Sequence, residues 1–225
     1  MSDNQSSEAH PLEWRGGVPV SARFDDPFYS LEDGLSESRH VFLGGNDLPA
    51  RFADGFHIGE LGFGTGLNFV AAALAWRAAG VDGTLRFTSF EAYPMAPRDA
   101  ADALAQFPEA EPFAPMILSA LGGSGPVDNL GITLSIVFGD ARDTLSCWEG
   151  KADAWFLDGF APARNPELWE PDLLRSVARH TVPEGTCATY SAAGSVRRAL
   201  AEAGFIVERV PGYGRKRHMT AGRLK

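Results

Sequence analysis

A Gly-rich junction between a strand pattern and a helix pattern constrains the fold of this chain more than any other feature. Residues 60–67 read ELGFGTGL, after a short apolar run and before a helix pattern with an apolar face. Glycines at every second position let the backbone turn sharply, and they let a ligand approach main-chain amides beside a helix N-terminus. The junction predicts a ligand-binding loop at a sheet edge, with a tight turn that binds nothing as the alternative.

Short apolar runs alternate with helix patterns along the rest of the chain. Strands are predicted at residues 56–61, 85–91, 132–138, 152–157, 186–190, 205–210 and 219–223, and helices at 67–79, 97–106, 166–179 and 193–203. This alternation is typical of a parallel sheet with helices on both faces. The last two strands are joined by a short Pro/Gly stretch, so the seventh should run antiparallel beside the sixth. We therefore predict an α/β, Rossmann-like fold of the class I methyltransferases, with seven strands in a mainly parallel sheet.

The remaining residues divide the chain further. Residues 1–10 are polar and predict a disordered tail. Residues 11–55 predict an N-terminal extension, with a hairpin and a small helix, that packs on the core, and residues 56–225 form the methyltransferase domain. A Pro/Gly-rich insertion lies between residues 107 and 131, and the sequence leaves its role open.

Composition limits the class of protein. The chain has 225 residues and a net charge of -9, which argues against a broad positive surface that coats nucleic acid, although every charged residue from Arg209 onward is basic. Its two cysteines and five histidines show no disulfide or metal-binding spacing, so we expect no metal. No signal peptide or long apolar run is present, which predicts a soluble cytoplasmic protein without a membrane partner.

The glycine spacing indicates the ligand. The pattern E-x-G-x-G-x-G differs from the G-x-G-x-x-G fingerprint of dinucleotide-binding folds. Glu60, at the end of its strand, can accept a hydrogen bond from the ammonium group of S-adenosylmethionine. We therefore predict S-adenosylmethionine as the cofactor.

Acidic residues end three further predicted strands. Glu91 lies where Rossmann-type sheets place the carboxylate that binds ribose hydroxyls. Asp140 can accept from an adenine amino group, and Asp158, at the central strand, should point into the crevice where cofactor and substrate meet. Each residue alone could be a capping residue, but carboxylates at successive strand ends predict one binding site.

The turn after Asp158 suits an aromatic substrate. Phe160 and Pro162 can form a flat apolar surface under a base, in an arrangement similar to the Asp/Asn-Pro-Pro-aromatic loop of amino-methyltransferases. A capped turn with a buried Phe160 is the alternative.

Four segments together resemble one family, the methyltransferase half of MnmC, also found as the stand-alone MnmD. They are residues 60–69, 153–166, 196–205 and 212–217, and the resemblance spans residues 18–222. It implies methyl transfer to the exocyclic amine of 5-aminomethyl-(2-thio)uridine at the wobble position of tRNA, which yields 5-methylaminomethyl-(2-thio)uridine and S-adenosylhomocysteine. The chain has no flavin-dependent domain, so we expect no FAD, no obligate protein partner, and upstream enzymes that supply the aminomethyl group.

The resemblance also implies roles for individual residues. Asp158 would be catalytic. The cofactor-binding set would be Tyr29, Glu60, Gly62, Gly64, Thr65, Gly66, Asn68, Glu91, Asp140 and Ala141. The substrate-binding set would be Phe160, Pro162, Arg164, Arg197, Arg215, Lys216 and Arg217, the last three toward tRNA phosphate.

The chain departs from the family pattern at two places, and its sequence is compatible with two rival functions. Relatives often carry Lys where this chain has Ala92, and the pair Phe28-Tyr29 stands in swapped order, so which of the two covers the cofactor is open. The basic cluster at 215–217 could simply solvate a turn. The rivals are an amino-methyltransferase for a small molecule or protein, and a non-catalytic module that only binds S-adenosylmethionine.

Overall fold

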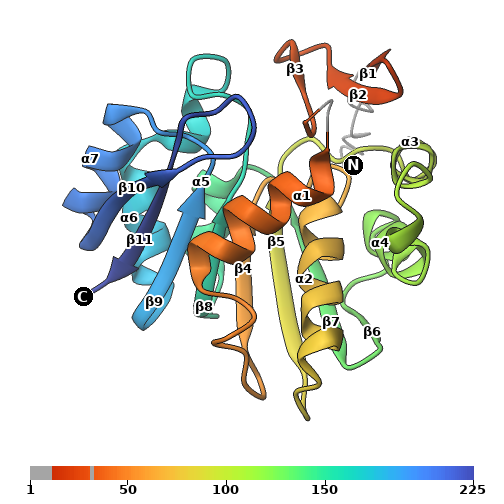
Figure 1. The fold of residues 1–225 in the computed structure, drawn as a ribbon, viewed down its shortest axis with the longest axis horizontal. Helices are drawn as coiled ribbons and strands as arrows, with labels where there is room; N and C mark the ends of the chain where they lie inside the picture. Colours follow the sequence, from red (N-terminus) through yellow and green to blue (C-terminus); the bar gives the residue numbers. More distant parts are fainter. Residues whose placement is uncertain (1–11, 31–32) are drawn as a thin grey trace, which may run out of the picture.

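A computed structural model describes residues 12–30 and 33–225, and within them two sheets are present. The small one has three antiparallel strands, β1 (Leu12–Arg15), β2 (Val18–Ser21) and β3 (Asp26–Pro27). The large one has eight strands in the order β10-β11-β9-β8-β4-β5-β7-β6. Figure 1 shows the small sheet above one edge of the large sheet.

The large sheet has the predicted topology with one more strand than predicted. Its parallel centre consists of β4 (His57–Leu61), β5 (Leu85–Glu91), β7 (Ile132–Phe138), β8 (Ala152–Leu157) and β9 (Thr181–Thr189). As predicted, β11 (His218–Leu224) runs antiparallel beside β10 (Phe205–Pro211), and it also pairs with β9. The prediction of seven strands is wrong, because β6 (Val127–Asn129) adds an antiparallel edge to β7.

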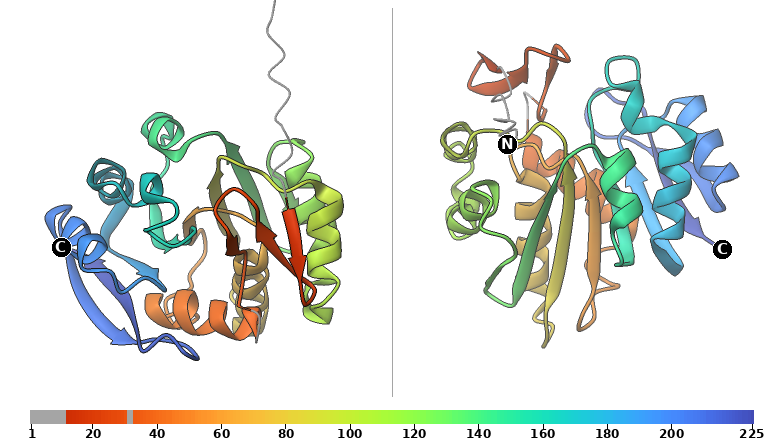
Figure 2. Two further views of the ribbon diagram at one scale, coloured as in Figure 1. Left: turned by 90° about the horizontal axis from the view of Figure 1, so that it is seen from above. Right: turned by 180° about the vertical axis from the view of Figure 1, so that it is seen from behind.

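Helices cover both faces of the large sheet, as the views in Figure 2 show. One face is packed by α1 (Gly34–Ser38), the π-helix η1 (Arg39–Leu43), α2 (Leu67–Ala79), α3 (Pro97–Leu104) and α4 (Ala114–Leu121). The other is packed by α5 (Ala141–Thr144), α6 (Pro171–Arg179) and α7 (Gly194–Glu202). Short 3-10 turns complete the chain: η2 (Gly44–Asn46), η3 (Pro108–Ala110), η4 (Leu145–Cys147) and η5 (Pro166–Trp169).

Two predicted segments differ in detail. The single helix expected over residues 166–179 is divided into η5 and α6, because Glu170 before Pro171 is extended, with φ -62° and ψ 140°. The insertion at 107–131 is ordered: it holds η3, α4 and β6, and Met116 and Ile117 of α4 are buried in the core. The insertion therefore extends the sheet and its helical layer.

The chain order of the strands fixes where a ligand can bind. All five parallel strands end at one edge, and the loops after them carry Gly62, Glu91, Asp140, Asp158 and Tyr190 on or beside that edge. Open α/β sheets bind ligands outside the carboxyl ends of their strands. The small sheet lies over the same edge and brings residues from the N-terminal part of the chain to it.

Among the described residues, none of the helices has the length and apolar character needed to cross a membrane.

Candidate functional site

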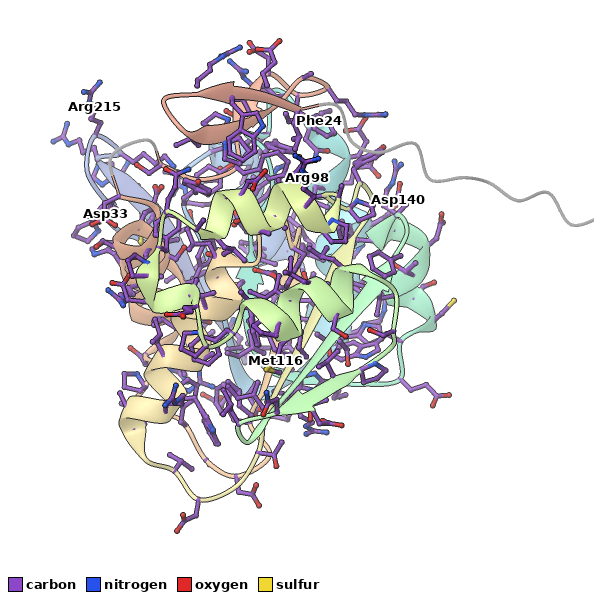
Figure 3. The ribbon with its side chains drawn as sticks, turned by 90° about the vertical axis from the view of Figure 1, so that its right-hand side faces the viewer. Phe24, Asp33, Arg98, Met116, Asp140 and Arg215 are labelled. Atoms are coloured by element: carbon purple, nitrogen blue, oxygen red, sulfur yellow. The ribbon has the colours of Figure 1, made fainter. Side chains whose placement is uncertain are left out.

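A cavity of about 590 Å³ opens at the carboxyl edge of the parallel strands. The loops after β4, β5, β7, β8 and β9 form its floor, and residues 23–30, α1 and the loop at 213–216 form its walls. Its volume is in the range of small-molecule and cofactor sites. In Figure 3, Phe24, Asp140 and Arg215 mark this end of the molecule, and the Arg215 side chain projects outward from its loop at the rim.

The glycine loop forms part of the floor, and its shape requires glycine. Gly62 and Gly64 have φ of +84° and +55°, in the left-handed region that favours glycine. A Cβ on Gly62 would lie 2.5 Å from the carbonyl oxygen of Asp158, so β4 and β8 approach too closely there for any side chain. Gly66, by contrast, faces Phe63 and Ile117 and is outside the set of cavity-lining residues.

Glu91 holds the glycine loop in place from the next strand. Its Oε2 accepts hydrogen bonds from the amides of Phe63 (2.9 Å) and Gly64 (3.1 Å), and its Oε1 accepts one from the Tyr93 amide (2.7 Å). Burial raises the pKa of Glu91, and these amide donors oppose that shift. The Ala92 amide is a further donor, so main-chain amides take up most of the roughly four acceptor positions of this carboxylate.

A buried carboxyl group, Glu60, and a half-buried one, Asp158, share one amide at the base of the cavity. Asn68 Nδ2, from the first turn of α2, donates to Glu60 Oε1 at 3.0 Å and to Asp158 Oδ2 at 2.6 Å. The Ser38 hydroxyl donates to Asn68 Oδ1 at 2.6 Å, which fixes the orientation of the amide. Glu60 Oε2 is fully buried and makes no hydrogen bond of ordinary geometry.

Burial governs the charge of this pair. It raises the pKa of Glu60 well above its usual value and the pKa of Asp158 to about 7. At neutral pH the site therefore holds less negative charge than two free carboxylates would. It gains negative charge when a cationic ligand binds, because a nearby cation favours ionisation of the carboxyl groups.

Aromatic side chains form the opposite wall. Phe160 stacks on Phe24 with ring centroids 4.7 Å apart and meets Phe28 edge-on at 5.2 Å. The Ala161 amide donates to Asp26 Oδ2 at 2.9 Å, which ties the loop after β8 to the small sheet. The guanidinium of Arg23 lies 4.3 Å from the centroid of the Tyr93 ring. The cavity thus has a polar, acidic floor beside an aromatic wall.

The structure brings most of the predicted site residues together. Those that line the cavity are Tyr29, Gly62, Gly64, Thr65, Asn68, Glu91, Asp140, Ala141, Asp158, Phe160, Arg215 and Lys216. Glu60 reaches it through Asn68. The set of lining residues leaves out Gly66, Pro162, Arg164, Arg197 and Arg217.

Two predicted residues have partners that the sequence did not reveal. Asp140 caps α5 and pairs with Arg142, with Nη2 and Oδ2 2.6 Å apart, and the hydrogen bonds from Arg142 lower the pKa of Asp140. Arg164 pairs with Asp25 (3.1 Å) and donates to the Phe24 carbonyl, so it fastens the small sheet from outside the cavity.

Several lining residues escaped the sequence interpretation, among them Glu37, Ser38, Tyr190, Phe24 and Tyr93. Glu37 and Ser38 belong to a five-residue helix without a recognisable motif. Tyr190 directly follows β9, so the rule that found the other strand-end residues would have found it too.

Basic residues gather beside the cavity, around His218. Because Pro211 pairs with His218 in the β10–β11 ladder, Arg209 and His218 lie on the same face of that ladder. This face packs against α7, whose first turns carry Arg197. Desolvation and the charges of Arg209, Arg217 and Arg197 lower the pKa of His218. These four residues form the basic patch.

Comparison with known proteins places the chain among methyltransferases. A family model described as "S-adenosyl-L-methionine-dependent methyltransferase" matches residues 111–225. Similar curated proteins are the tRNA 5-methylaminomethyl-2-thiouridine biosynthesis bifunctional proteins MnmC of Marinobacter nauticus (44% identity over 96% of this chain and 37% of the relative) and Pseudomonas aeruginosa (44% over 99% and 36%). The chain thus spans little more than a third of the length of these relatives.

Solved structures agree in fold. MnmC2 from Aquifex aeolicus superposes with a TM-score of 0.75 at 26% identity, covering 99% of this chain and 72% of that one. A precorrin-6y C5,15-methyltransferase from Geobacter metallireducens gives a TM-score of 0.53 at 13% identity, over 92% of this chain and 94% of that one, which shows the fold alone.

Proposed function

The chain belongs to the S-adenosyl-L-methionine-dependent methyltransferase family, and from this premise we propose that it methylates the exocyclic amine of 5-aminomethyl-(2-thio)uridine at the tRNA wobble position. The product is 5-methylaminomethyl-(2-thio)uridine. The relatives named MnmC confirm the resemblance found in the sequence, and the solved methyltransferase structures confirm the class I fold. The tRNA substrate, a cytoplasmic location and upstream enzymes that supply the aminomethyl group belong to the proposal.

One observation carries the proposal: a pair of carboxyl groups bridged by Asn68 beside the glycine loop, with Asp158 lining a cavity that has an aromatic wall. S-adenosylmethionine supplies a methyl group on a cationic sulfonium. We assign its own ammonium group to the Glu60 side of this pair, since the Glu60 carboxyl group reaches the cavity through Asn68. Gly62 and Gly64 let it approach the loop backbone.

The remaining cofactor contacts follow from position. We assign the ribose hydroxyls to Glu91, which ends β5 and lines the cavity. The adenine edge is assigned to Asp140 and Ala141 at the end of β7, and Phe28 and Tyr29 lie where a side chain can cover the bound molecule. These residues bind and orient the cofactor and exclude water.

Asp158 would act on the substrate amine. An alkylamine has a pKa of about 10.4, as in Lys, so almost all of it is protonated at neutral pH and lacks the lone pair that attacks the methyl group. A carboxylate at the end of β8 can accept a hydrogen bond or a proton from that amine. The stacked rings of Phe24 and Phe160 offer a surface for the uracil ring beside it. Positioning of the amine in line with the methyl group should then dominate the rate.

The basic patch offers a site for tRNA phosphates. It lies at the same edge of the sheet as the cavity mouth, since the β10–β11 loop contributes both Arg217 to the patch and Lys216 to the cavity. With a net charge of -9, the protein needs such a local concentration of positive charge to attract a polyanion.

The decisive experiment measures tritiated methyl transfer to total tRNA from a strain that lacks this gene. We expect incorporation into the aminomethyl-uridine nucleoside after digestion, and none into tRNA from a strain that cannot make the aminomethyl group. Free aminomethyl-nucleoside serves as the comparison. Turnover of that nucleoside as efficient as turnover of tRNA would favour a small-molecule enzyme. Cofactor binding without transfer to any acceptor would favour a non-catalytic module.

A further inference from the structure

We propose that Lys216 and Glu37 form an ion pair that controls the protonation of Asp158, which makes Lys216 a positioning residue of the cavity. The inference rests on the proposed function, because Asp158 matters only if an amine is methylated. It replaces the expectation that Lys216 contacts tRNA phosphate.

The geometry places the charge of Lys216 inside the cavity wall. Its Nζ lies 2.8 Å from Glu37 Oε1 and 4.1 Å from the centroid of the Tyr190 ring. The Glu37 side chain is 14% exposed, whereas that of Lys216 is 47% exposed, so the lysine runs along the surface and its ammonium group ends at a nearly buried partner. A cation held on both sides in this way is poorly available to a phosphate.

A short chain of contacts links this ammonium group to Asp158. The Tyr190 hydroxyl donates to the carbonyl of Gly159, and the Gly159 amide donates to Asp158 Oδ1 at 3.0 Å. The loop that carries Lys216 is itself fixed, since the Lys216 amide donates to the Tyr213 carbonyl at 3.0 Å. It is also joined to η1 by a hydrogen bond between the His40 ring and the Pro211 carbonyl. The loop that carries Lys216 is therefore held next to η1, which directly follows the helix that carries Glu37.

The charged groups around Asp158 raise or lower its pKa. Burial is the largest influence and raises the pKa of Asp158 to about 7; Lys216 lowers the pKa, and Glu37 raises it. Glu60 faces Asp158 across Asn68. Burial raises the pKa of Tyr190, and the carboxylates of Asp158, Asp26 and Glu37 raise it further, so the Tyr190 hydroxyl stays protonated. Among these groups, Lys216 favours the ionised form of Asp158.

The chemical consequence follows directly. Ionised Asp158 accepts a proton from the substrate ammonium group, and the freed lone pair on nitrogen forms the N–C bond. The C–S bond breaks, its electron pair stays on sulfur, and the product leaves as a methylammonium. Asp158 then returns its proton to water, so one proton is released for each turnover. Loss of Lys216 would leave Asp158 protonated, and unable to accept, over a wider pH range.

The test uses the opposite effects of Lys216 and Glu37 on the pKa of Asp158. Single-turnover rates with saturating tRNA and cofactor are measured from pH 5.5 to 9.5 for Lys216→Met, Glu37→Gln, the double variant and the wild type. We expect Lys216→Met to shift the acidic limb of the pH–rate profile to higher pH by about one unit. The single-turnover rate should then fall by up to about tenfold near pH 6.5 and match the wild type above pH 9. Glu37→Gln should shift the limb downward, and the double variant should lie near the wild type.

Controls separate this role from general damage. Lys151→Met removes a lysine at the start of β8, outside the cavity lining, and should leave the profile unchanged. Lys216→Arg keeps the charge and should retain the wild-type limb. In the cofactor-free protein, the carboxyl ¹³C signal of Asp158, identified through Asp158→Asn, should titrate at a higher pH in Lys216→Met, which tests the inference without catalysis.

Two results would overturn the inference. One is a set of superimposable pH profiles and carboxyl titrations. The other is a Lys216→Met variant that changes only the salt dependence of tRNA binding, as a phosphate contact would. A wild-type protein that transfers no methyl group to tRNA at any pH would instead overturn the proposed function.

Discussion

The amide of Asn68 performs two tasks that a charged donor could not combine. It donates to Glu60 and Asp158 at once, and because it is neutral it leaves room for a ligand cation beside them. A lysine in its place would neutralise the carboxylates permanently. The arrangement keeps two acids close together in a buried site, and that cost is relieved when a cationic ligand binds.

Asp158→Asn should separate catalysis from stability. The variant keeps the shape but cannot take a proton, so single-turnover methylation at pH 7.5 should fall by about 10²-fold or more and recover as rising pH deprotonates the amine itself. A wild-type rate at pH 7.5 would make Asp158 a turn residue.

The same variant should be more stable than the wild type at alkaline pH. Asp158 titrates near 7 when folded and near 4 when unfolded, so ionisation favours the unfolded wild type progressively between those values. The free energy of unfolding should therefore favour Asp158→Asn by roughly 2–4 kcal/mol at pH 8 and by little at pH 4. Urea denaturation at both pH values measures the difference, and a gap that does not change with pH would contradict it.

At this scale the sequence predicted residues whose role depends on strand position and missed those that depend on a distant partner. Glu60, Glu91 and Asp158 follow from the ends of parallel strands. Lys216 was predicted as a phosphate contact, and its pairing with Glu37 was missed because Glu37 is 179 residues away in the chain. A basic triplet in a sequence cannot show which of its members turns inward.

Among the elements, the glycine loop offers the clearest test. Gly64→Val should abolish cofactor binding, since the side chain would project where the cofactor meets the backbone, and its Cβ would already lie 3.1 Å from the Phe28 ring. Gly80→Val is the matched control, because Gly80 has a similar φ of +61° with no other atom within 4 Å of an added Cβ. Both should lose about 1–2 kcal/mol of stability from backbone strain. Calorimetry should find wild-type cofactor affinity only in Gly80→Val, and undiminished affinity in Gly64→Val would move the pocket elsewhere.

The elements themselves were predicted well where periodicity was long. The strands β5, β7 and β8 and the helix α2 have the predicted bounds. The strand β6 has three residues, two of them exposed, and is too short to show an alternating pattern. The domain boundary at residue 55 stays a prediction, although residues of η1 and α2 share one hydrophobic core.

For the whole molecule, an acidic protein with a local basic patch should bind tRNA with a measurable salt dependence. Replacing Arg197, Arg209 and Arg217 by Ala should raise KM for tRNA and reduce the log-log salt slope by up to about 0.9 for each lost duplex contact. Cofactor affinity should not change. The control replaces Lys151, Arg179 and Lys225, which carry the same total charge at the amino edge of the sheet. Equal slopes in the two triple variants would show that overall charge, and not the patch, attracts the tRNA.

The mouth of the cavity is built from segments that come from opposite ends of the chain. Residues 23–30, helix α1 and residues 213–216 supply its walls, whereas the glycine loop and the strand ends supply its floor. Under the proposed function each stretch serves both ligands, because Phe28 and Tyr29 of the walls would cover the cofactor and Phe160 of the floor would face the acceptor. Recombination or engineering confined to the two wall segments should therefore change the choice of amine and the affinity for the methyl donor together.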